Sequence, residues 1–196
     1  MKTIASLLSA LTLLLGGAAS AAPIPSAGID HVGINVPSLQ QAEQFFGDAF
    51  GCVAVTHIGP FPIPPSMSHE HTSAVPAQAD SVRIAMLRCG SGANIELFAY
   101  KNAQGKLLTP QAGEIGASHI AFYTDDVAAG VANLKARGIT ILGEQVTMPG
   151  GDTAGETWVH FISPWGSEME LVGYPKGKGY EKSAKLKLWN PKYPAR

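Results

Sequence analysis

NIELFAY, at residues 94–100, alternates apolar and other side chains with the period of two that marks a β-strand. The apolar residues share one face, and the opposite face carries the carboxylate of Glu96 at its middle. About seventy residues later, SEMELVGYP (167–175) repeats this pattern around Glu170. Two strands of the same design predict a duplicated unit, with a carboxylate at an equivalent place in each copy.

The residues before 94 complete the first unit. Strand-like runs precede NIELFAY at GIDHVGINV (28–36), CVAVTHIG (52–59) and SVRIAMLRC (81–89). PSLQQAEQFFGDAFG (37–51) predicts a helix that begins with a capping box of Ser38 and Gln41 and ends at Gly51. The Gly-Ser-Gly at 90–92 predicts a hairpin into NIELFAY. The predicted order is therefore β-α-β-β-β.

The second unit follows the same order. Its predicted strands are at 117–124, 139–146, 157–164 and 167–175, and its predicted helix is at 125–138. Asp125 or Asp126 is expected to cap this helix, and Gly138 is expected to end it. DHVGINV matches SHIAFYT, NIELFAY matches EMELVGY, and the extra residues of the first copy fall mostly in a loop around 60–80. We therefore predict an α+β domain at 28–175, with modules at about 28–101 and 115–175.

Each module also opens with a histidine, His31 in the first and His119 in the second. By strand parity, the face opposite the apolar residues carries both histidines, Glu96 and Glu170. The helix of each module must pack on the apolar face, so these four residues are expected on the uncovered face of the sheets. Imidazole and carboxylate ligands suit a divalent transition metal, and four of them leave positions open for substrate oxygens. We predict one such metal per site, without distinguishing Zn, Ni, Mn or Fe, held by His31, Glu96, His119 and Glu170.

Two simpler interpretations remain open at this stage. A single His or Glu on a half-exposed sheet face is commonly just solvated. Ion pairs within each module, His31 with Glu96 and His119 with Glu170, would also produce the pattern. The repetition at matching places in two modules favours the metal site, and the metal content of the protein would decide between these interpretations.

The order and spacing of DHVGINV, NIELFAY, SHIAFYTDDV and SPWGSEMELVGYP resemble the vicinal oxygen chelate superfamily. This superfamily includes glyoxalase I, extradiol dioxygenases, methylmalonyl-CoA epimerase and fosfomycin-resistance enzymes. The resemblance covers about residues 28–175 and implies that the two modules form a half-barrel around the metal. Bacterial-type glyoxalase I uses His, Glu, His and Glu in this order, whereas extradiol dioxygenases use two His and one Glu, and the epimerase usually has Gln in place of Glu96. The resemblance allows a site completed within one chain or across a homodimer.

The resemblance implies a glyoxalase-like isomerase or lyase that chelates vicinal oxygens of a small substrate, while Glu96 or Glu170 moves a proton. The chain departs from glyoxalase I, because it shows no clear basic cluster for the carboxylates of glutathione. We therefore expect a different substrate pocket, shaped by His57, Tyr123, Trp158, His160 and Trp165. The alternatives are an Fe(II) extradiol-type dioxygenase and a non-catalytic protein that sequesters a small molecule.

The first 21 residues have the layout of a secretory signal peptide. Lys2 precedes an apolar run at 4–15, and Ala19-Ser20-Ala21 matches the cleavage pattern. The run is shorter than the roughly 20 residues that span a bilayer. We predict a secreted or periplasmic protein that starts near Ala22 and does not contact the membrane after cleavage. A net charge of −1 and an ordinary composition give no reason to expect nucleic-acid binding.

The two cysteines predict a disulfide, because paired cysteines in exported proteins are commonly oxidised. If 52–59 and 81–89 pair antiparallel, Cys52 lies beside Cys89; the alternative is two separate buried thiols. Residues 176–196 form a basic extension. We expect it to be solvated or loosely packed, with an anionic-surface contact or docking through Trp189 as alternatives.

Overall fold

The computed structural model describes residues 26, 28–64, 79–102 and 113–194 of the 196-residue chain. The expected signal peptide at 1–21 and most of the 60–80 loop lie outside these residues. The described elements, in chain order, are β1 (His31–Asn35), α1 (Leu39–Phe50), β2 (Val53–Pro62), β3 (Ser81–Arg88), β4 (Asn94–Lys101), β5 (Ile120–Tyr123), α2 (Val127–Ala136), β6 (Thr140–Thr147), β7 (Thr157–Ile162), β8 (Glu168–Gly173) and the short 3₁₀ helix η2 (Gly179–Lys182).

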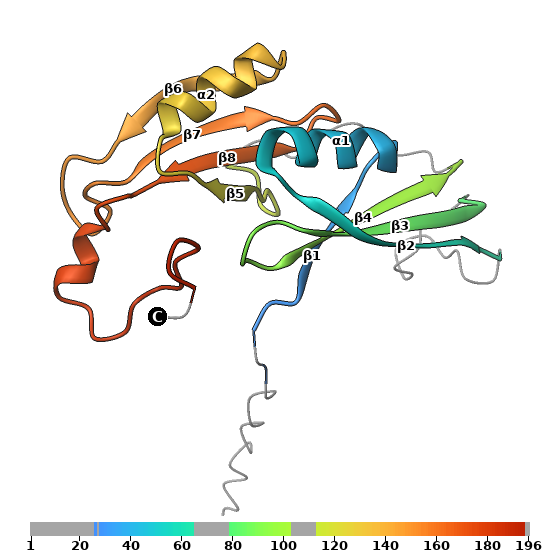
Figure 1. Ribbon diagram of the computed structural model, residues 1–196, viewed down its shortest axis with the longest axis horizontal. Helices are drawn as coiled ribbons and strands as arrows, with labels where there is room; N and C mark the ends of the chain where they lie inside the picture. The colour runs from blue at the N-terminus through green and yellow to red at the C-terminus, as the bar shows by residue number, and fades with distance from the viewer. Residues whose placement is uncertain (1–25, 27, 65–78, 103–112, 195–196) are drawn as a thin grey trace, which may run out of the picture.

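The strands form two sheets of identical topology (Figure 1). The strand order is β1-β4-β3-β2 in the first sheet and β5-β8-β7-β6 in the second. In each sheet the first and last strands pair in parallel, and the other neighbours are antiparallel. The predicted α+β class with two β-α-β-β-β modules is confirmed. The two sheets stay separate and do not close into a barrel.

Helix α1 begins and ends where its sequence predicts. The backbone N–H of Gln41 donates to the hydroxyl of Ser38 at 3.3 Å, which satisfies one of the free amides of the first turn. Gly51 follows the last turn with φ of 67°, a left-handed conformation that costs glycine little. Its N–H bonds back to the carbonyl oxygen of Gly47 at 2.9 Å.

Helix α2 is capped by the second of the two candidate aspartates. The carboxylate of Asp126 accepts a hydrogen bond from the N–H of Ala129 at 2.9 Å, whereas Asp125 binds Lys192 of the C-terminal extension. The helix ends at Ala136, and Gly138 follows with φ of 74°. Asp125 is therefore free of the capping role and connects to another part of the chain.

The two modules share one hydrophobic core, which lies between the sheets and the helix layer. Helices α1 and α2 lie on the same side of the two sheets (Figure 1). Phe46 on α1 is fully buried and contacts Phe122 and Trp165 of the second module, at ring-centroid distances of 6.0 and 5.5 Å. Phe50 stacks on Phe122 at 3.9 Å. Packing around α1 therefore holds the second module against the first.

Strand β2 differs from its sequence expectation, because it continues to Pro62 instead of ending at residue 59. It pairs antiparallel with β3, with Val53 opposite Arg88. This pairing places Cys52 beside Cys89, and the two are joined by a disulfide with a Cα–Cα distance of 4.3 Å. The disulfide therefore fastens the beginning of β2 to the end of β3.

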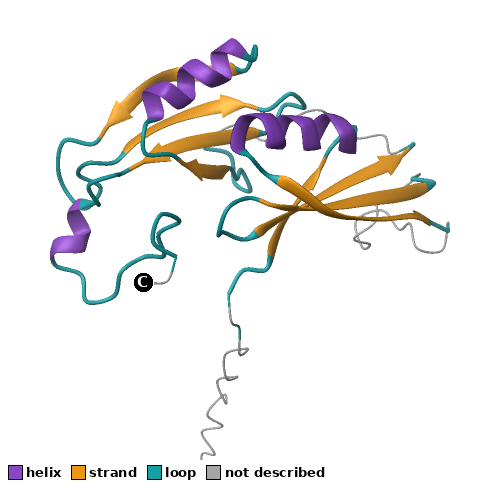
Figure 2. Cartoon of the chain, in the orientation of Figure 1, coloured by secondary structure: helices purple, strands orange, loops and turns teal. Residues whose placement is uncertain are grey.

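The C-terminal extension docks on both modules instead of remaining fully solvated. Of its described residues, 176–194, those outside η2 are loop (Figure 2). The ammonium of Lys192 donates to both carboxylate oxygens of Asp125 at 2.8 Å, on the second module. The hydroxyl of Ser91, in the β3–β4 hairpin of the first module, donates to the carbonyl oxygen of Pro191 at 3.2 Å. Within the described part of the chain, no helix has the length and apolar character needed to span a membrane.

Candidate functional site

The face of each sheet turned away from the helices carries the predicted metal ligands. In β4 the buried residues are Ile95 and Leu97, which leaves Glu96 on the other face. In β8 the buried residues flanking Glu170 are Met169 and Leu171. We call this side of both sheets the open face. Burial therefore follows the alternation that the sequence predicts for these two strands.

In the first module the open face brings His31 and Glu96 together. The Nε2 atom of His31 lies 3.0 Å from Oε2 of Glu96, and its Nδ1 atom lies 2.8 Å from the carboxylate of Asp30. The hydrogen bond to Asp30, and the negative charges of Glu96 and Asp30, raise the pKa of His31 above its ordinary value, against a smaller opposing effect of desolvation. Carboxylates on both ring nitrogens thus hold the imidazole in one orientation.

In the second module the equivalent pair is extended by a second histidine. The Nε2 atom of His119 lies 2.8 Å from Oε2 of Glu170. His160 on β7 is directly opposite Glu170 in the strand register, and its Nε2 atom lies 4.0 Å from the same carboxylate oxygen. The Nδ1 atom of His160 lies 2.5 Å from the carboxylate of Glu168. The rings of His119 and His160 meet edge to face at 4.8 Å.

His119, His160 and Glu170 fit a metal ion. Each offers one ligand atom, and these atoms lie within 4.8 Å of one another. In a tetrahedral site, metal–ligand distances of about 2.0–2.2 Å place neighbouring ligand atoms about 3.3–3.6 Å apart, so these three side chains would have to close in by about 1 Å to share one ion. The donor set of two imidazoles and one carboxylate is also chemically suited to a divalent transition metal.

The four predicted ligands are not gathered in one group within a single chain. Among the described residues, His31 and Glu96 form their own pair and do not join the three residues of the second module. The ion-pair interpretation and the metal interpretation involve the same atoms. In each module, the carboxylate oxygen that lies beside the imidazole Nε2 atom is also the oxygen that would bind a metal together with that nitrogen.

The predicted pocket residues separate into two groups. Tyr123, Trp158 and His160 have the strand parity of the open face, and Trp158 contacts the ring of His160 at 5.4 Å. Tyr123 donates its hydroxyl proton to Asp125 at 2.6 Å, and burial together with this bond raises its pKa well above the ordinary value. These three residues therefore share the open face with the His–Glu pairs.

His57 and Trp165 lie on the helix side, away from the His–Glu pairs, and His57 lines a separate cavity there. A bulge in β2 between Ala54 and Thr56 reverses the alternation, so that His57 pairs with the fully buried Ala85. Its Nε2 atom lies 2.9 Å from Glu43 on α1. Trp165, in the turn between β7 and β8, is only 8% exposed and packs in the core against the phenylalanines of α1.

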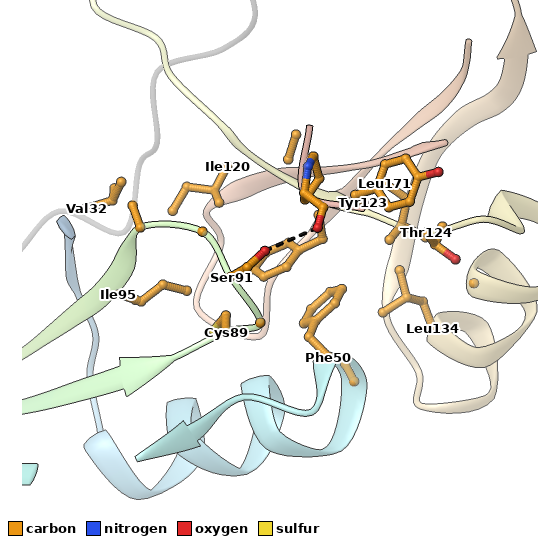
Figure 3. Close-up of a pocket in the computed structure, with 18 of the residues that line it drawn as sticks. Val32, Phe50, Cys89, Ser91, Ile95, Ile120, Tyr123, Thr124, Leu134 and Leu171 are labelled. Atoms are coloured by element: carbon orange, nitrogen blue, oxygen red, sulfur yellow. Dashed lines mark hydrogen bonds between the residues drawn. The ribbon is translucent and has the colours of Figure 1, made fainter. Parts of the chain in front are cut away.

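A cavity of about 750 Å³ lies at the junction of the modules (Figure 3), and neither His–Glu pair is among the residues that line it. Its walls are mainly apolar, with Val32 and Ile95 from the first module and Ile120 and Leu171 from the second. The C-terminal extension borders it through Trp189 and Pro191. None of the imidazole and carboxylate groups on the open face lines this cavity, whereas the predicted pocket residue Tyr123 does.

Glu168 is the residue of the open face that the sequence prediction did not include in the site. It lies two positions before Glu170 and therefore on the same face. Strand parity could have indicated Glu168, but its partner His160 lies eight positions earlier, on another strand. Only the register between β7 and β8 brings the two together.

Comparisons with known proteins agree with this architecture. Residues 30–155 match the family model of the glyoxalase/bleomycin resistance protein/dioxygenase superfamily. A 2-epi-5-epi-valiolone epimerase from Actinomyces sp. is 33% identical over 171 residues, which cover 86% of this chain and 91% of that protein.

Solved structures show the same fold at lower identity. A glyoxalase family protein from Bacillus cereus superposes with a TM-score of 0.59 at 20% identity, covering 79% of this chain and 98% of that one. The trypanothione-dependent glyoxalase I of Leishmania major gives a TM-score of 0.52 at 19% identity, covering 81% and 93%. At these identities the structures support the fold alone.

Proposed function

The chain belongs to the glyoxalase/bleomycin resistance protein/dioxygenase superfamily, and from this premise we propose that it is a metal-dependent enzyme of the isomerase type. The observation that carries the proposal is the pair of His–Glu contacts at equivalent positions of the two modules, His31 with Glu96 and His119 with Glu170. Both pairs lie on the face that the helices leave open. The fold does not need ionisable groups there, and a repeated site explains their repetition.

The 33% identical relative supports isomerase over lyase chemistry, because it is named an epimerase. An epimerase removes a proton from one stereocentre and returns a proton to the opposite face of the same carbon. Such a carbon must lie next to a group that accepts the electron pair, such as a carbonyl. We therefore propose a small substrate with vicinal oxygens, one of them a carbonyl oxygen beside the stereocentre.

The chain's own carboxylates suit the proton transfers. A divalent metal, when bound by the His and Glu residues of the open face, supplies Lewis-acid polarisation of the substrate oxygens. A carboxylate oxygen of Glu96 or Glu170 takes the proton from the carbon, and the electron pair moves onto the carbonyl oxygen. With carboxyl groups from two modules on the two faces of the carbon, the ionised one removes the proton. The other, protonated beforehand, returns its proton as the electron pair moves back from the oxygen to the carbon.

We propose that the complete site forms across a homodimer. The support is that the two His–Glu pairs form no single ligand group within the described chain. Mixing His31→Ala and His119→Ala protomers tests this, because a mixed dimer keeps one intact site. Random exchange should restore catalytic activity to roughly a quarter of the sites if the site is shared. No restoration would show that each chain builds its own site.

The catalytic proposal is tested by metal content and proton exchange. Elemental analysis of the purified protein should find about one transition metal per site. In D₂O, the enzyme should introduce deuterium at the carbon beside the carbonyl of 2-epi-5-epi-valiolone, the compound for which the relative is named. Glu96→Gln and Glu170→Gln should lower this exchange at least about 100-fold, the usual scale of a lost acid–base group.

Glu43→Gln is the matched control, since Glu43 also pairs with a histidine but lies on the helix side. It should leave both metal content and exchange unchanged. A protein that takes up no metal after loading at neutral pH would refute the enzyme proposal. A metal-free protein that still bound small molecules would then fit the sequestering function instead.

A specific observation favours a second candidate function. His119, His160 and Glu170 form a two-histidine, one-carboxylate set, the ligand type of non-haem Fe(II) oxygenases. An Fe(II) extradiol-type dioxygenase would consume O₂ when given a catechol, whereas the isomerase would not. Iron-loaded protein in an oxygen electrode with catechol therefore separates the two functions.

Export of the protein is likewise a proposal. It depends on the signal-peptide pattern of residues 1–21 and on the compatibility of a disulfide with an oxidising compartment. N-terminal sequencing of protein recovered from the periplasm or the medium should start near Ala22. An intact Met1 on protein that stays in the cytoplasm would contradict export.

A further inference from the structure

We propose that His160 is an additional metal ligand of the second module and that Glu168 positions its ring for this role. The proposal deepens the metal-dependent function above and rests on it. It assigns the second module three protein ligands, His119, His160 and Glu170, where the repeated pattern alone assigns two.

The orientation of the His160 ring is the first observation. Its Nδ1 atom lies 2.5 Å from the carboxylate of Glu168, so in the neutral ring the proton resides on Nδ1 and is donated to that carboxylate. The lone pair of Nε2 is then free, and Nε2 is the atom that lies 4.0 Å from Glu170. A carboxylate that binds the far nitrogen of a metal-ligating histidine is the arrangement that fixes the tautomer in known metal sites.

The surroundings hold the ring in this orientation. Trp158 contacts it on one side at 5.4 Å and His119 on another at 4.8 Å, both edge to face. The side chains of His160 and Glu168 are 22% and 14% exposed, whereas His119 is 42% exposed. A half-buried and ring-packed imidazole loses little conformational freedom when it binds a metal.

Comparison of the two modules provides an internal control. Met86 on β3 is opposite Glu96, as His160 on β7 is opposite Glu170. Asn94 lies two positions before Glu96, as Glu168 lies two positions before Glu170. The first module therefore builds the same sheet without this imidazole and carboxylate, and the fold alone does not explain their presence in the second.

An unequal division of ligands between the modules follows. The second module offers two imidazoles and a carboxylate within 4.8 Å, and the first module offers one imidazole and one carboxylate. The second module should therefore bind the metal more tightly. His31→Phe should weaken metal binding less than His119→Phe does.

The test measures Zn²⁺ affinity by competition with a chelator, and the nitrogen ligands of bound Cu²⁺ by electron paramagnetic resonance, in the full-length mature protein. His160→Phe keeps a ring against Trp158 but removes both nitrogens. It should lower Zn²⁺ affinity more than about 100-fold and remove one nitrogen from the Cu²⁺ spectrum. Glu168→Asn, which copies Asn94 of the first module, should lower affinity about 10–100-fold and keep the nitrogen count.

Two controls make the result decisive. His57→Phe changes a histidine that is also paired with a glutamate, but on the helix side, and should leave affinity and spectrum unchanged. His160→Met copies Met86, a residue that the equivalent position of the first module accommodates, and replaces His160→Phe if circular dichroism shows that the latter is misfolded.

The outcomes separate the two proposals. If wild-type protein binds neither ion, the metal-dependent function fails and the role of His160 fails with it. If wild-type protein binds and His119→Phe does not, while His160→Phe keeps full affinity and all nitrogens, the role of His160 alone is overturned. Loss of affinity and of one nitrogen in His160→Phe supports it.

Discussion

The disulfide between Cys52 and Cys89 permits a prediction whose size follows from the fold. Its two cysteines are 37 positions apart, and the antiparallel pairing of β2 and β3 brings them together without the bond. Removing the bond therefore changes the native structure little. Its main effect is to raise the conformational entropy of the unfolded chain. For a closed loop of this length the chain-entropy estimate is about 4 kcal/mol. Because domains of this size are stable by about 5–15 kcal/mol, this is a large share of the total.

The assay is urea unfolding of the wild type and of the Cys52→Ala/Cys89→Ala variant, monitored by circular dichroism. The midpoint should fall and the free energy of unfolding should drop by about 4 kcal/mol. Cys52 is also buried, so alanine removes some core packing. Wild-type protein treated with a reductant separates the two effects, because it loses the bond but keeps both side chains. A loss below about 1 kcal/mol on reduction, or two titratable thiols in native protein, would refute the reasoning.

Three further predictions concern packing, capping and pH. Phe46→Ala removes the ring that joins the modules and should lower the free energy of unfolding by about 3–5 kcal/mol in urea unfolding; an unchanged midpoint would show that the modules do not share a core. Ser38→Ala should cost about 1 kcal/mol, measured in the same way, whereas Ser38→Asp, which keeps a capping acceptor, should not. The hydrogen bond from Lys192, followed by that from Tyr123, lowers the pKa of Asp125, so docking of the C-terminal extension should be complete above the ordinary aspartate pKa and be lost as the pH falls through the lowered value. Acid-active protease should therefore cleave the extension increasingly as the pH drops, and Lys192→Met should be cleaved equally at all these pH values.

The sequence predicts most of the fold because its signals are local. The cap at Ser38, the left-handed stop at Gly51 and the alternation around Glu96 and Glu170 each depend on a few neighbouring residues. Duplication then adds information, because each module supports the interpretation of the other. The sequence does not distinguish Asp125 from Asp126 as the cap, since both positions offer the same chemistry.

The sequence predicts the site less completely because parity is reliable only along an unbroken strand. The bulge after Ala54 turns His57 toward α1, and nothing in the local pattern marks that bulge. Trp165 follows the last residue of β7 in a turn, where alternation has no meaning, and packing places it in the core. The sequence places His160 in the predicted substrate pocket. Without the register between β7 and β8, it does not show that His160 lies beside Glu168 and Glu170.

The sequence by itself determined the two modules, the elements within each, and the face on which Glu96 and Glu170 lie, because hydrophobic periodicity is a property of each segment alone. Only the tertiary structure decided which of these groups meet. Cross-strand register places His160 and Glu168 beside the His119–Glu170 pair, and the packing of α1 on the second module leaves His31 and Glu96 as a separate pair. Both depend on contacts between distant residues, which are selected by burial of the whole core and not by any one stretch of the chain.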